Sequence, residues 1–223
     1  MGRTKKLWKK VKAMNVQHTI KLGPINTESL VKDPKHLAFT LSRYKFVVKM
    51  MGTCKHIVEI GCGEGVGALM LLAETSAKIT AIDFDKSQIE YAREHVLPYG
   101  KGRLSFKHRD IISECSARPR GDGLVCIDVI EHINFAEQNV FLNNCIGYLK
   151  RNGIAIFGTP NKNATRYASE RSKVGHINLF DHKRFDHTLK EYFRHVFLFS
   201  MNDEMIHTGF SPLAHYLIAL CIK

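Results

Sequence analysis

The sequence predicts an α/β protein with a doubly wound, mostly parallel seven-stranded sheet of the Rossmann-like kind, in which the last strand runs antiparallel. Two observations lead to this prediction. Runs with the periodicity of strands alternate with runs that have the periodicity of helices along most of the chain. In addition, the glycine-rich stretch VEIGCGEGVG, residues 58–67, follows the first apolar run, which is where doubly wound sheets bind their ligands.

The first half of the chain opens with a helix. Asp33 and Pro34 are typical of a helix start, with an N-cap carboxylate and a proline in the first turn, and the apolar pattern continues to about residue 51. The period then switches from element to element. We expect strands over residues 55–60, 78–83 and 104–108, and helices over residues 65–76 and 87–96.

The second half continues the alternation and ends in two strands. We expect a strand at 123–128, a helix at 136–149 with Gly153 as its C-terminal cap, and a strand at 154–159. A helix at 184–193 precedes strands at 195–201 and 214–222, which are close enough in sequence to pair antiparallel. Residues 160–183 are polar and aperiodic, and we interpret them as a substrate-covering loop.

Composition fits an ordinary globular protein of 223 residues, with 44% hydrophobic and 24% charged residues. No apolar run approaches the roughly 18–20 residues of a membrane span, and no signal peptide is recognisable, so a cytoplasmic location is expected. The six cysteines form no CxxC pair and are interpreted as free thiols. Nothing in the sequence indicates the oligomeric state.

A strong positive charge favours anionic partners. Lysine and arginine number 33 against 21 acidic residues, which gives a formal net charge of +12. Residues 1–32 are expected to form a basic N-terminal arm, followed by one domain over 33–223. The cluster between Arg3 and Lys12 surrounds the only tryptophan, Trp8; it is interpreted either as a solvated tail or as a contact for anionic lipid or a polyanion.

The glycine stretch narrows the choice of ligand. Gly61, Gly63 and Gly65 allow a tight turn and a close approach of backbone amides to a ligand at the following helix N-terminus. The third glycine of a dinucleotide-binding GxGxxG is replaced by Val66, which disfavours NAD. A phosphate-binding GxxxxGK[ST] motif is also absent from the sequence, which disfavours an ATPase or GTPase.

Five segments in order, VEIGCGEG, ITAIDFD, KHRDI, LVCIDVIEHI and IAIFGTPN, resemble the class I S-adenosylmethionine-dependent methyltransferases over residues 55–160. They are most similar to the small-molecule branch that includes the ubiquinone-biosynthesis O-methyltransferases. The resemblance implies S-adenosyl-L-methionine as cofactor. The cofactor-binding residues that it implies are Glu59, Gly61, Cys62, Gly63, Gly65, Asp83, Phe84, Asp110, Ile111 and Asp128.

Within that resemblance, Glu59 holds the methionine end of the cofactor, Asp83 accepts the ribose hydroxyls and Phe84 lies against the adenine. Asp110 accepts from the adenine amino group, with Ile111 beside it. Asp83 and Asp110 are also good helix caps, and each has that alternative role.

The segment DVIEH is expected to carry the chemistry. In some relatives an E-x-x-E-H arrangement at this point binds a divalent cation, and here Asp128 replaces its first glutamate. Asp128, Glu131, His132 and His176 are therefore candidate ligands of Mg²⁺, Mn²⁺ or Zn²⁺. Without a metal, His132 is the best general base and His176 the next, with Glu131 as part of the catalytic cluster.

The resulting hypothesis is a methyltransferase acting on a hydroxyl, in preference to an amine, of a small anionic metabolite such as a sugar nucleotide. Arg43, Tyr44 and Asn161 are candidate substrate contacts. Two alternatives stay open. The charge is compatible with an RNA methyltransferase, although no RNA-binding module is recognisable. A non-catalytic module that only binds S-adenosylmethionine would retain the same glycine stretch.

Overall fold

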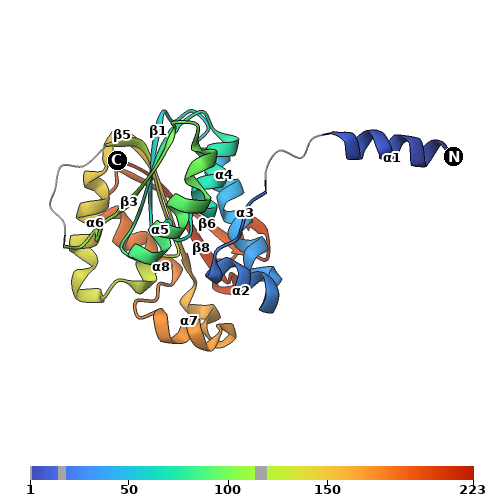
Figure 1. Cartoon of the computed structure of the whole chain (residues 1–223). Coiled ribbons are helices and arrows are strands. Elements are labelled where there is room, and N and C mark those ends of the chain that lie inside the picture. Colours follow the sequence, from blue (N-terminus) through green and yellow to red (C-terminus); the bar gives the residue numbers. More distant parts are fainter. Residues whose placement is uncertain (1, 15–18, 114–119) are drawn as a thin grey trace.

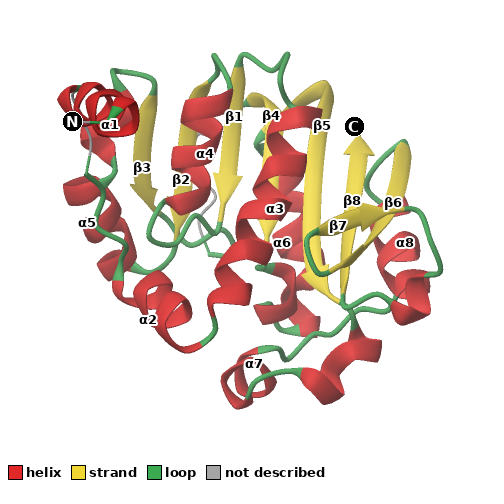
Figure 2. Ribbon diagram, turned by 90° about the vertical axis from the view of Figure 1, so that its right-hand side faces the viewer, coloured by secondary structure: helices red, strands yellow, loops and turns green. Residues whose placement is uncertain are grey.

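The structure is a computed structural model that describes residues 2–14, 19–113 and 120–223. The described residues form one sheet of eight strands (Figures 1 and 2). In spatial order these are β3 (Leu104–His108), β2 (Lys78–Asp83), β1 (His56–Ile60), β4 (Gly121–Ile127), β5 (Leu149–Pro160), β8 (Tyr216–Ile222), β6 (His195–Asn202) and β7 (Met205–His207).

The strand directions confirm the predicted fold class. Strands β3, β2, β1, β4 and β5 are parallel neighbours, whereas β8 lies antiparallel between β5 and β6. The count exceeds the expected seven strands because β7 forms a short antiparallel hairpin with β6 at the sheet edge. Three residues are too few to give a recognisable period, so the sequence pattern did not indicate β7.

The helices lie on both faces of the sheet. They are α1 (Arg3–Ala13), α2 (Pro24–Lys32), α3 (Pro34–Met50), α4 (Val66–Glu74), α5 (Lys86–His95), α6 (Gln138–Gly147), α7 (Glu170–Gly175) and α8 (His182–Lys190). Short 3-10 turns occupy η1 (Leu97–Gly100), η2 (Ile130–His132), η3 (Phe135–Glu137), η4 (Lys162–Tyr167) and η5 (Ser211–Leu213). Every helix expected from periodicity is present within a few residues of its predicted bounds.

One expected cap is wrong. Gly153 does not end α6, which stops at Gly147; it lies inside the longer strand β5. The reason is that β5 already begins at Leu149, opposite Gly121 of β4, and Asn152 introduces a positive φ of 60° in the extended chain. Tertiary pairing thus overrides the local Arg-Asn-Gly signal.

Two apolar clusters fill the two faces of the sheet. Alternating strand residues face opposite sides, so Ile57 of β1 lies in one cluster and Val58 in the other. Helices α3, α4 and α5 contribute to the first cluster, and α6 and α8 contribute to the second. The sheet is therefore buried on both faces, as its apolar strands predict.

The N-terminal residues contain two helices. Figure 1 shows α1 projecting away from the α/β domain, while α2 packs against α3. The boundary between arm and domain at residue 32 stays a prediction, and residues 15–18 lie outside the described residues. Among the described residues no helix is both long and apolar enough to cross a membrane. The cysteines Cys54, Cys62, Cys126, Cys145 and Cys221 are free and buried, whereas Cys115 lies outside the described residues.

Candidate functional site

The glycine stretch forms a tight loop between β1 and α4. Gly61, Gly63 and Gly65 have φ angles of +75°, +53° and +88°, which side chains with a Cβ rarely adopt. The backbone amide of Gly61 donates to the carbonyl of Ile82 at 2.8 Å, which fixes the loop to the end of β2. The loop delivers the chain to the N-terminus of α4, where free backbone amides face the carboxyl edge of the sheet.

Asp83, the last residue of β2, lies against this loop. The amides of Gly63 and Asp85 donate to its two carboxylate oxygens at 2.8 and 2.9 Å. Each oxygen has a further lone pair, so the carboxylate retains the capacity to accept from a ligand. The following Phe84 is 73% exposed, an unusual environment for a phenyl ring in an otherwise buried sheet.

Asp110 follows β3 and caps the next turn. Its oxygens accept from the amide of Ile112 at 2.9 Å and from the hydroxyl of Ser113 at 2.8 Å. Partial burial raises the pKa of Asp110, but these hydrogen bonds outweigh it and hold the pKa below the ordinary value. The capping alternative recognised in the sequence is thus present, and it leaves lone pairs free for a second partner.

These elements enclose a cavity of about 650 Å³ at the carboxyl edge of the parallel strands. Figure 2 shows β1, β2 and β3 pointing toward that edge, where α2 and α7 also lie. The residues expected to bind cofactor or substrate that line it are Tyr44, Gly61, Cys62, Gly63, Asp83, Phe84, Asp110, Ile111, Asp128 and His132. Its size is within the usual range for a site that holds a nucleotide-sized ligand.

Other wall residues escaped the sequence analysis. Ile25 and Asn26 of α2 and His36 and Thr40 of α3 line the cavity. Helix α2 has only weak amphipathicity, and nothing in its local sequence indicates a position over the glycine loop. The carboxylate of Glu64 holds α2 in this position by accepting from the amide of Ile25 at 2.7 Å. The acidic residue at position 64 of the glycine stretch was therefore the feature of the sequence that could have indicated a covering helix.

Glu59 lies behind the cavity wall. Its carboxylate is fully buried and accepts from the Tyr44 hydroxyl at 2.6 Å. Among the described residues its Oε2 atom has no hydrogen-bond partner. Burial raises the pKa of Glu59 to about 8, although the Tyr44 hydrogen bond opposes that rise. The unpartnered Oε2 atom can accept a hydrogen bond, and a cationic group of a ligand would provide the donor that this buried oxygen lacks.

Asp128 is engaged by a buried arginine rather than by the other candidate metal ligands. The guanidinium of Arg43, 4% exposed, forms an ion pair with the Asp128 carboxylate and stacks on Tyr216 with 3.9 Å to the ring centroid. Asp128 has a φ of +58° and lines the cavity. Arg43, expected as a substrate contact, does not itself line the cavity.

Asn161 is likewise placed away from the cavity wall. Its amide nitrogen donates to the carbonyls of Ser211 and Ala214, both at 2.9 Å, and its side-chain oxygen accepts from the amide of Asn163 at 3.1 Å. The Asn161 side chain therefore links the start of η4 to η5 through these hydrogen bonds. The Asn161 side chain thus lies between two turns, and its role as a substrate contact stays a prediction.

Glu131 is fully buried within the DVIEH segment. The Thr159 hydroxyl donates to its Oε2 atom at 3.1 Å, while Oε1 has no partner among the described residues. Burial raises the pKa of Glu131 to about 8, and the neighbouring charge of Asp128 adds to the rise. The backbone carbonyl of Glu131 accepts from Asn178 at 2.9 Å, which ties the 160–183 segment to this site.

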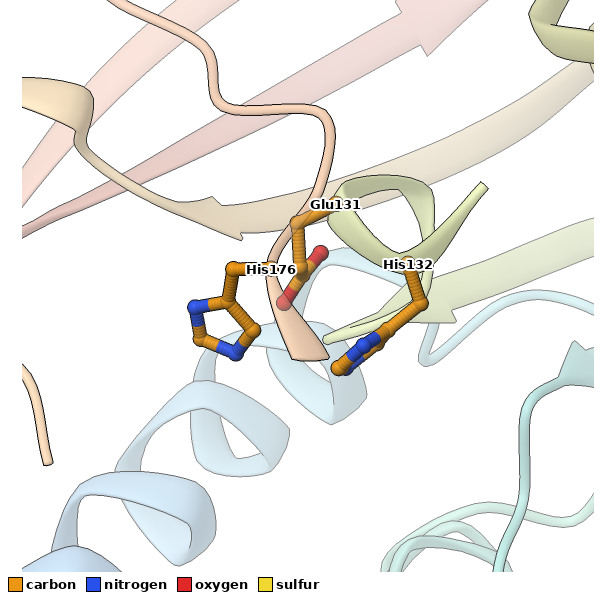
Figure 3. Close-up of side chains that lie close together, drawn as sticks. All are labelled: Glu131, His132 and His176. Atoms are coloured by element: carbon orange, nitrogen blue, oxygen red, sulfur yellow. The ribbon is translucent and has the colours of Figure 1, made fainter. Parts of the chain in front are cut away.

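His132 and His176 complete a compact cluster with Glu131. The ring centroids of the two histidines are 5.0 Å apart, and Figure 3 shows the Glu131 carboxylate beside both rings. One ligand atom from each of the three residues lies within 4.8 Å of the other two. Asp128 does not belong to this group, so the structure brings together three of the four residues expected to bind metal.

The orientation of His132 follows from one hydrogen bond. Its Nδ1 atom is 2.8 Å from the carbonyl of Gly175, which can only accept. Nδ1 must therefore carry the proton in the neutral ring, and Nε2 keeps a lone pair. The 160–183 segment, which contains η4 and α7 rather than a continuous loop, thus reaches the site through Gly175 and His176.

The fold and the cavity together define an α/β protein with an open site at the carboxyl edge of its sheet, the usual place for a ligand in doubly wound sheets. Comparison with known proteins gives the class. Residues 57–153 match the family described as a methyltransferase domain. The chain is 29% identical over 160 residues to a ubiquinone biosynthesis O-methyltransferase of Rickettsia felis, a match that covers 72% of this chain and 58% of that relative.

Solved structures agree on the fold. The methyltransferase domain of bacterial CtHen1-C has a TM-score of 0.65 at 18% identity, covering 85% of this chain and 97% of that one. The N-methyltransferase NodS from Bradyrhizobium japonicum, solved with S-adenosyl-L-homocysteine, has a TM-score of 0.62 at 18% identity, covering 87% and 90% of the two chains. Over residues 57–153 the chain is thus similar to methyltransferase domains, and the described residues have the fold of the S-adenosylmethionine-dependent methyltransferases.

Proposed function

We propose that this protein transfers the methyl group of S-adenosylmethionine to a hydroxyl group of a small anionic molecule. The observation that carries the proposal is that one cavity is lined both by the glycine loop with Asp83 and by Asp128 with His132. A cofactor held at the first set of residues and an acceptor held at the second would share a single cavity. In-line methyl transfer requires that proximity.

In the proposed cofactor half, the Asp83 carboxylate accepts from the ribose hydroxyls and Phe84 covers the adenine. The lone pairs left on Asp83 and the exposure of Phe84 support these roles. Asp110 and Ile111 line the same cavity, which supports their assignment to the adenine end of the cofactor. The unpartnered Oε2 of Glu59 supports a role near the cationic methionine end, with Tyr44 between that carboxylate and the cavity. The bound cofactor supplies the methyl group as an electrophile on sulfur.

In the proposed acceptor half, Nε2 of His132 takes the hydroxyl proton. The acceptor oxygen forms its bond to the methyl carbon as the carbon–sulfur bond breaks, with the electron pair going to sulfur and the proton to His132. The hydrogen bond from Nδ1 to Gly175 supports this role because it holds the ring in the tautomer with a basic Nε2. His36 and Arg109, on the same cavity wall, favour an anionic acceptor.

The donor set of Glu131, His132 and His176 also fits a divalent cation. The unpartnered, buried Oε1 of Glu131 supports such a site, since it lies among two imidazoles with no hydrogen bond of its own in the described structure. One carboxylate and two imidazoles suit Mn²⁺ or Zn²⁺ better than Mg²⁺. A bound cation would occupy the Nε2 lone pair of His132, because Nδ1 donates to Gly175. It would then supply Lewis acidity toward an acceptor oxygen in place of proton transfer to that nitrogen. We propose the site for these three residues, with Asp128 held instead by Arg43.

The choice of a hydroxyl acceptor is supported by the relatives, whose name describes O-methylation. This chain spans 58% and 60% of the length of the first two curated relatives, so the acceptor is proposed only as a class. Phenols and hydroxyls of phosphorylated metabolites such as sugar nucleotides belong to that class. RNA is the competing anionic acceptor, given the net charge of +12.

Cofactor binding is tested by calorimetry with S-adenosylhomocysteine and with NAD. We expect binding of the first compound only. The Asp83→Asn variant should weaken it about 10- to 100-fold, because hydrogen bonds to a charged group are lost. Asp85→Asn is the matched control, since Asp85 caps α5 through Ser87 and Gln88. Binding of NAD, or equal effects of the two variants, would contradict the proposed cofactor half.

Turnover is tested by release of S-adenosylhomocysteine with phenols, phosphorylated sugars and RNA, with and without a chelator. We expect His132→Ala to bind cofactor normally and to lose about 100-fold or more of its turnover. The control is His187→Ala, whose side chain is 84% exposed on α8. Full turnover of His132→Ala would refute the base and the metal site together. Turnover that is insensitive to chelation would refute the metal alone.

A further inference from the structure

Helix α1 separates two kinds of side chain onto two faces. Thr4, Leu7, Trp8 and Val11 recur at spacings that place them on one face of the helix. The opposite arc carries Arg3, Lys5, Lys6, Lys9, Lys10 and Lys12. No lysine or arginine of the helix interrupts the apolar face. The segregation is a property of the helical geometry and is not visible from the basic composition alone.

The apolar face of α1 has no partner within the described chain. None of the residues of the helix is buried, and Leu7, Trp8 and Val11 are 55%, 59% and 47% exposed. Figure 1 shows the helix away from the α/β domain. An isolated helix of 11 residues is only marginally stable in water, so this segment needs a surface that covers its apolar side.

The charge on α1 specifies what kind of surface this is. Six cationic side chains lie between residues 3 and 12, and the first acidic residue of the whole chain is Glu28. Within the described ranges no ion pair involves α1. The complementary partner must therefore be both anionic and apolar. A nucleic-acid backbone offers the charge but no cover for Leu7 and Val11.

We propose that α1 binds in the plane of an anionic lipid bilayer, with its apolar face at the acyl boundary and its basic face at the headgroups. Trp8 lies at the margin between the two faces, beside Lys5 and Lys12 on the helical surface. That is the place where an indole meets both apolar and polar surroundings at a membrane interface. The helix would hold the catalytic domain near the membrane without spanning it.

This proposal does not depend on the proposed reaction, because α1 contributes no residue to the cavity wall. Trp8 is the only tryptophan of the chain, so its fluorescence reports on α1 in the intact protein. The test mixes the full chain with phosphatidylcholine vesicles that contain either no anionic lipid or about 30% phosphatidylglycerol. We expect a blue shift and at least about tenfold more bound protein on the anionic vesicles.

Two variants separate membrane insertion from attraction of charge alone. Val11→Asp and Ala13→Asp change the net charge equally, but Val11 lies on the apolar face and Ala13 on the basic one. We expect Val11→Asp to reduce vesicle binding about tenfold beyond the loss caused by Ala13→Asp. Cofactor binding by calorimetry should be unchanged in both, which shows that the domain is folded.

Three outcomes would overturn the proposal. The first is an equal loss of vesicle binding in Val11→Asp and Ala13→Asp. Attraction of charge alone would produce that result, because the two variants change the net charge equally. The second is binding of single-stranded RNA in preference to anionic vesicles, with no blue shift of Trp8. The third is no binding to vesicles of either composition at low ionic strength, where the attraction is strongest.

Discussion

The environment of Glu59 favours the protonated form of its carboxyl group. It is fully buried at the end of β1, and burial raises its pKa to about 8 from an ordinary value of 4.5. Between these two values the folded protein binds a proton that the unfolded chain has released. The contribution of Glu59 to stability is therefore complete below pH 4.5 and is lost as the pH rises through about 8.

Replacement of this acid should remove that pH dependence. We expect Glu59→Gln to flatten the fall of unfolding free energy between pH 5 and 8, where the wild-type carboxyl costs on the order of 1 kcal/mol per pH unit. The glutamine oxygen still accepts from Tyr44, so the packing is preserved. Urea denaturation at several pH values measures the difference between the two proteins.

The control for this experiment is Glu74→Gln at the exposed end of α4. It should leave the pH dependence of the wild type unchanged. A Glu59→Gln protein with the same slope as wild type would mean that Glu59 is ionised in the folded state, contrary to its buried position.

Single residues also mark the limit of what the sequence predicts. The glycine loop and Asp110 were recognisable because they follow predicted strands, and Asp83 because it ends one. The pairing of Arg43 with Asp128 joins residues 85 positions apart, and no local pattern encodes it. The same applies to His36, whose place on the cavity wall depends on how α3 packs.

At the scale of elements, α2 is held over the glycine loop by one buried carboxylate. Glu64 is 4% exposed, and its oxygens accept from the amides of Ile25 at 2.7 Å and Asn26 at 3.1 Å. The Asn26 side-chain amide adds a third bond at 2.5 Å. The carboxylate thus accepts hydrogen bonds from backbone amides at the start of α2, and its negative charge is attracted to the positive end of the helix dipole. Glu64 and its two partners in α2, Ile25 and Asn26, all line the cavity.

Loss of this anchor should release α2 without unfolding the domain. We expect Glu64→Ala to increase hydrogen exchange of the α2 amides about 10- to 100-fold, since hydrogen bonds to a charged group are lost. Cofactor affinity should fall with it, because Ile25 and Asn26 leave the wall. Mass spectrometry of exchanged peptides localises the change.

Glu28→Ala is the matched control within α2, because Glu28 forms a surface ion pair with Lys32 of the same helix. A second variant, Gly23→Ala, should reproduce the effect of Glu64→Ala, since an added Cβ at Gly23 would overlap the Glu64 carboxylate. Equal protection of α2 in Glu64→Ala and Glu28→Ala would show that another contact holds the helix.

The long elements were predictable and the short ones were not. Strands β2 and β3 have the predicted bounds, because buried strands between turn residues give a clear signal. Helices α2 and α7 lack a strong apolar period, and their positions depend on Glu64 and on the contacts of the 160–183 segment with Glu131. In the site, the sequence indicated the carboxyl ends of the strands but not the helix that covers them.

At the scale of the whole molecule, β8 joins both halves of the core. Tyr216 and Ile218 belong to one apolar cluster, and Leu217 and Ala219 belong to the other. Strand β8 also pairs along its length with β5 on one side and β6 on the other. Its removal or weakening should therefore affect both faces of the sheet at once.

We expect Ile218→Ala to lower the unfolding free energy by about 2–5 kcal/mol, the usual cost of a cavity at a buried isoleucine. Leu217→Ala should have a similar effect, and both proteins should still unfold in a single transition. Circular dichroism during urea denaturation measures this. The control is Leu213→Ala in η5, where the side chain is 76% exposed. Two separate transitions in either variant would contradict a shared core.

The place of β8 in the chain has a consequence during synthesis. Because this strand follows all the others in sequence yet sits between two of them, β5 and β6 cannot be joined until residue 222 has left the ribosome. Until then β5 and β6 are unpaired on the sides that β8 later occupies, and these exposed strand edges can pair with another polypeptide. We infer that slow translation of residues 216–222, or their loss through premature termination, yields aggregates rather than a shortened folded protein.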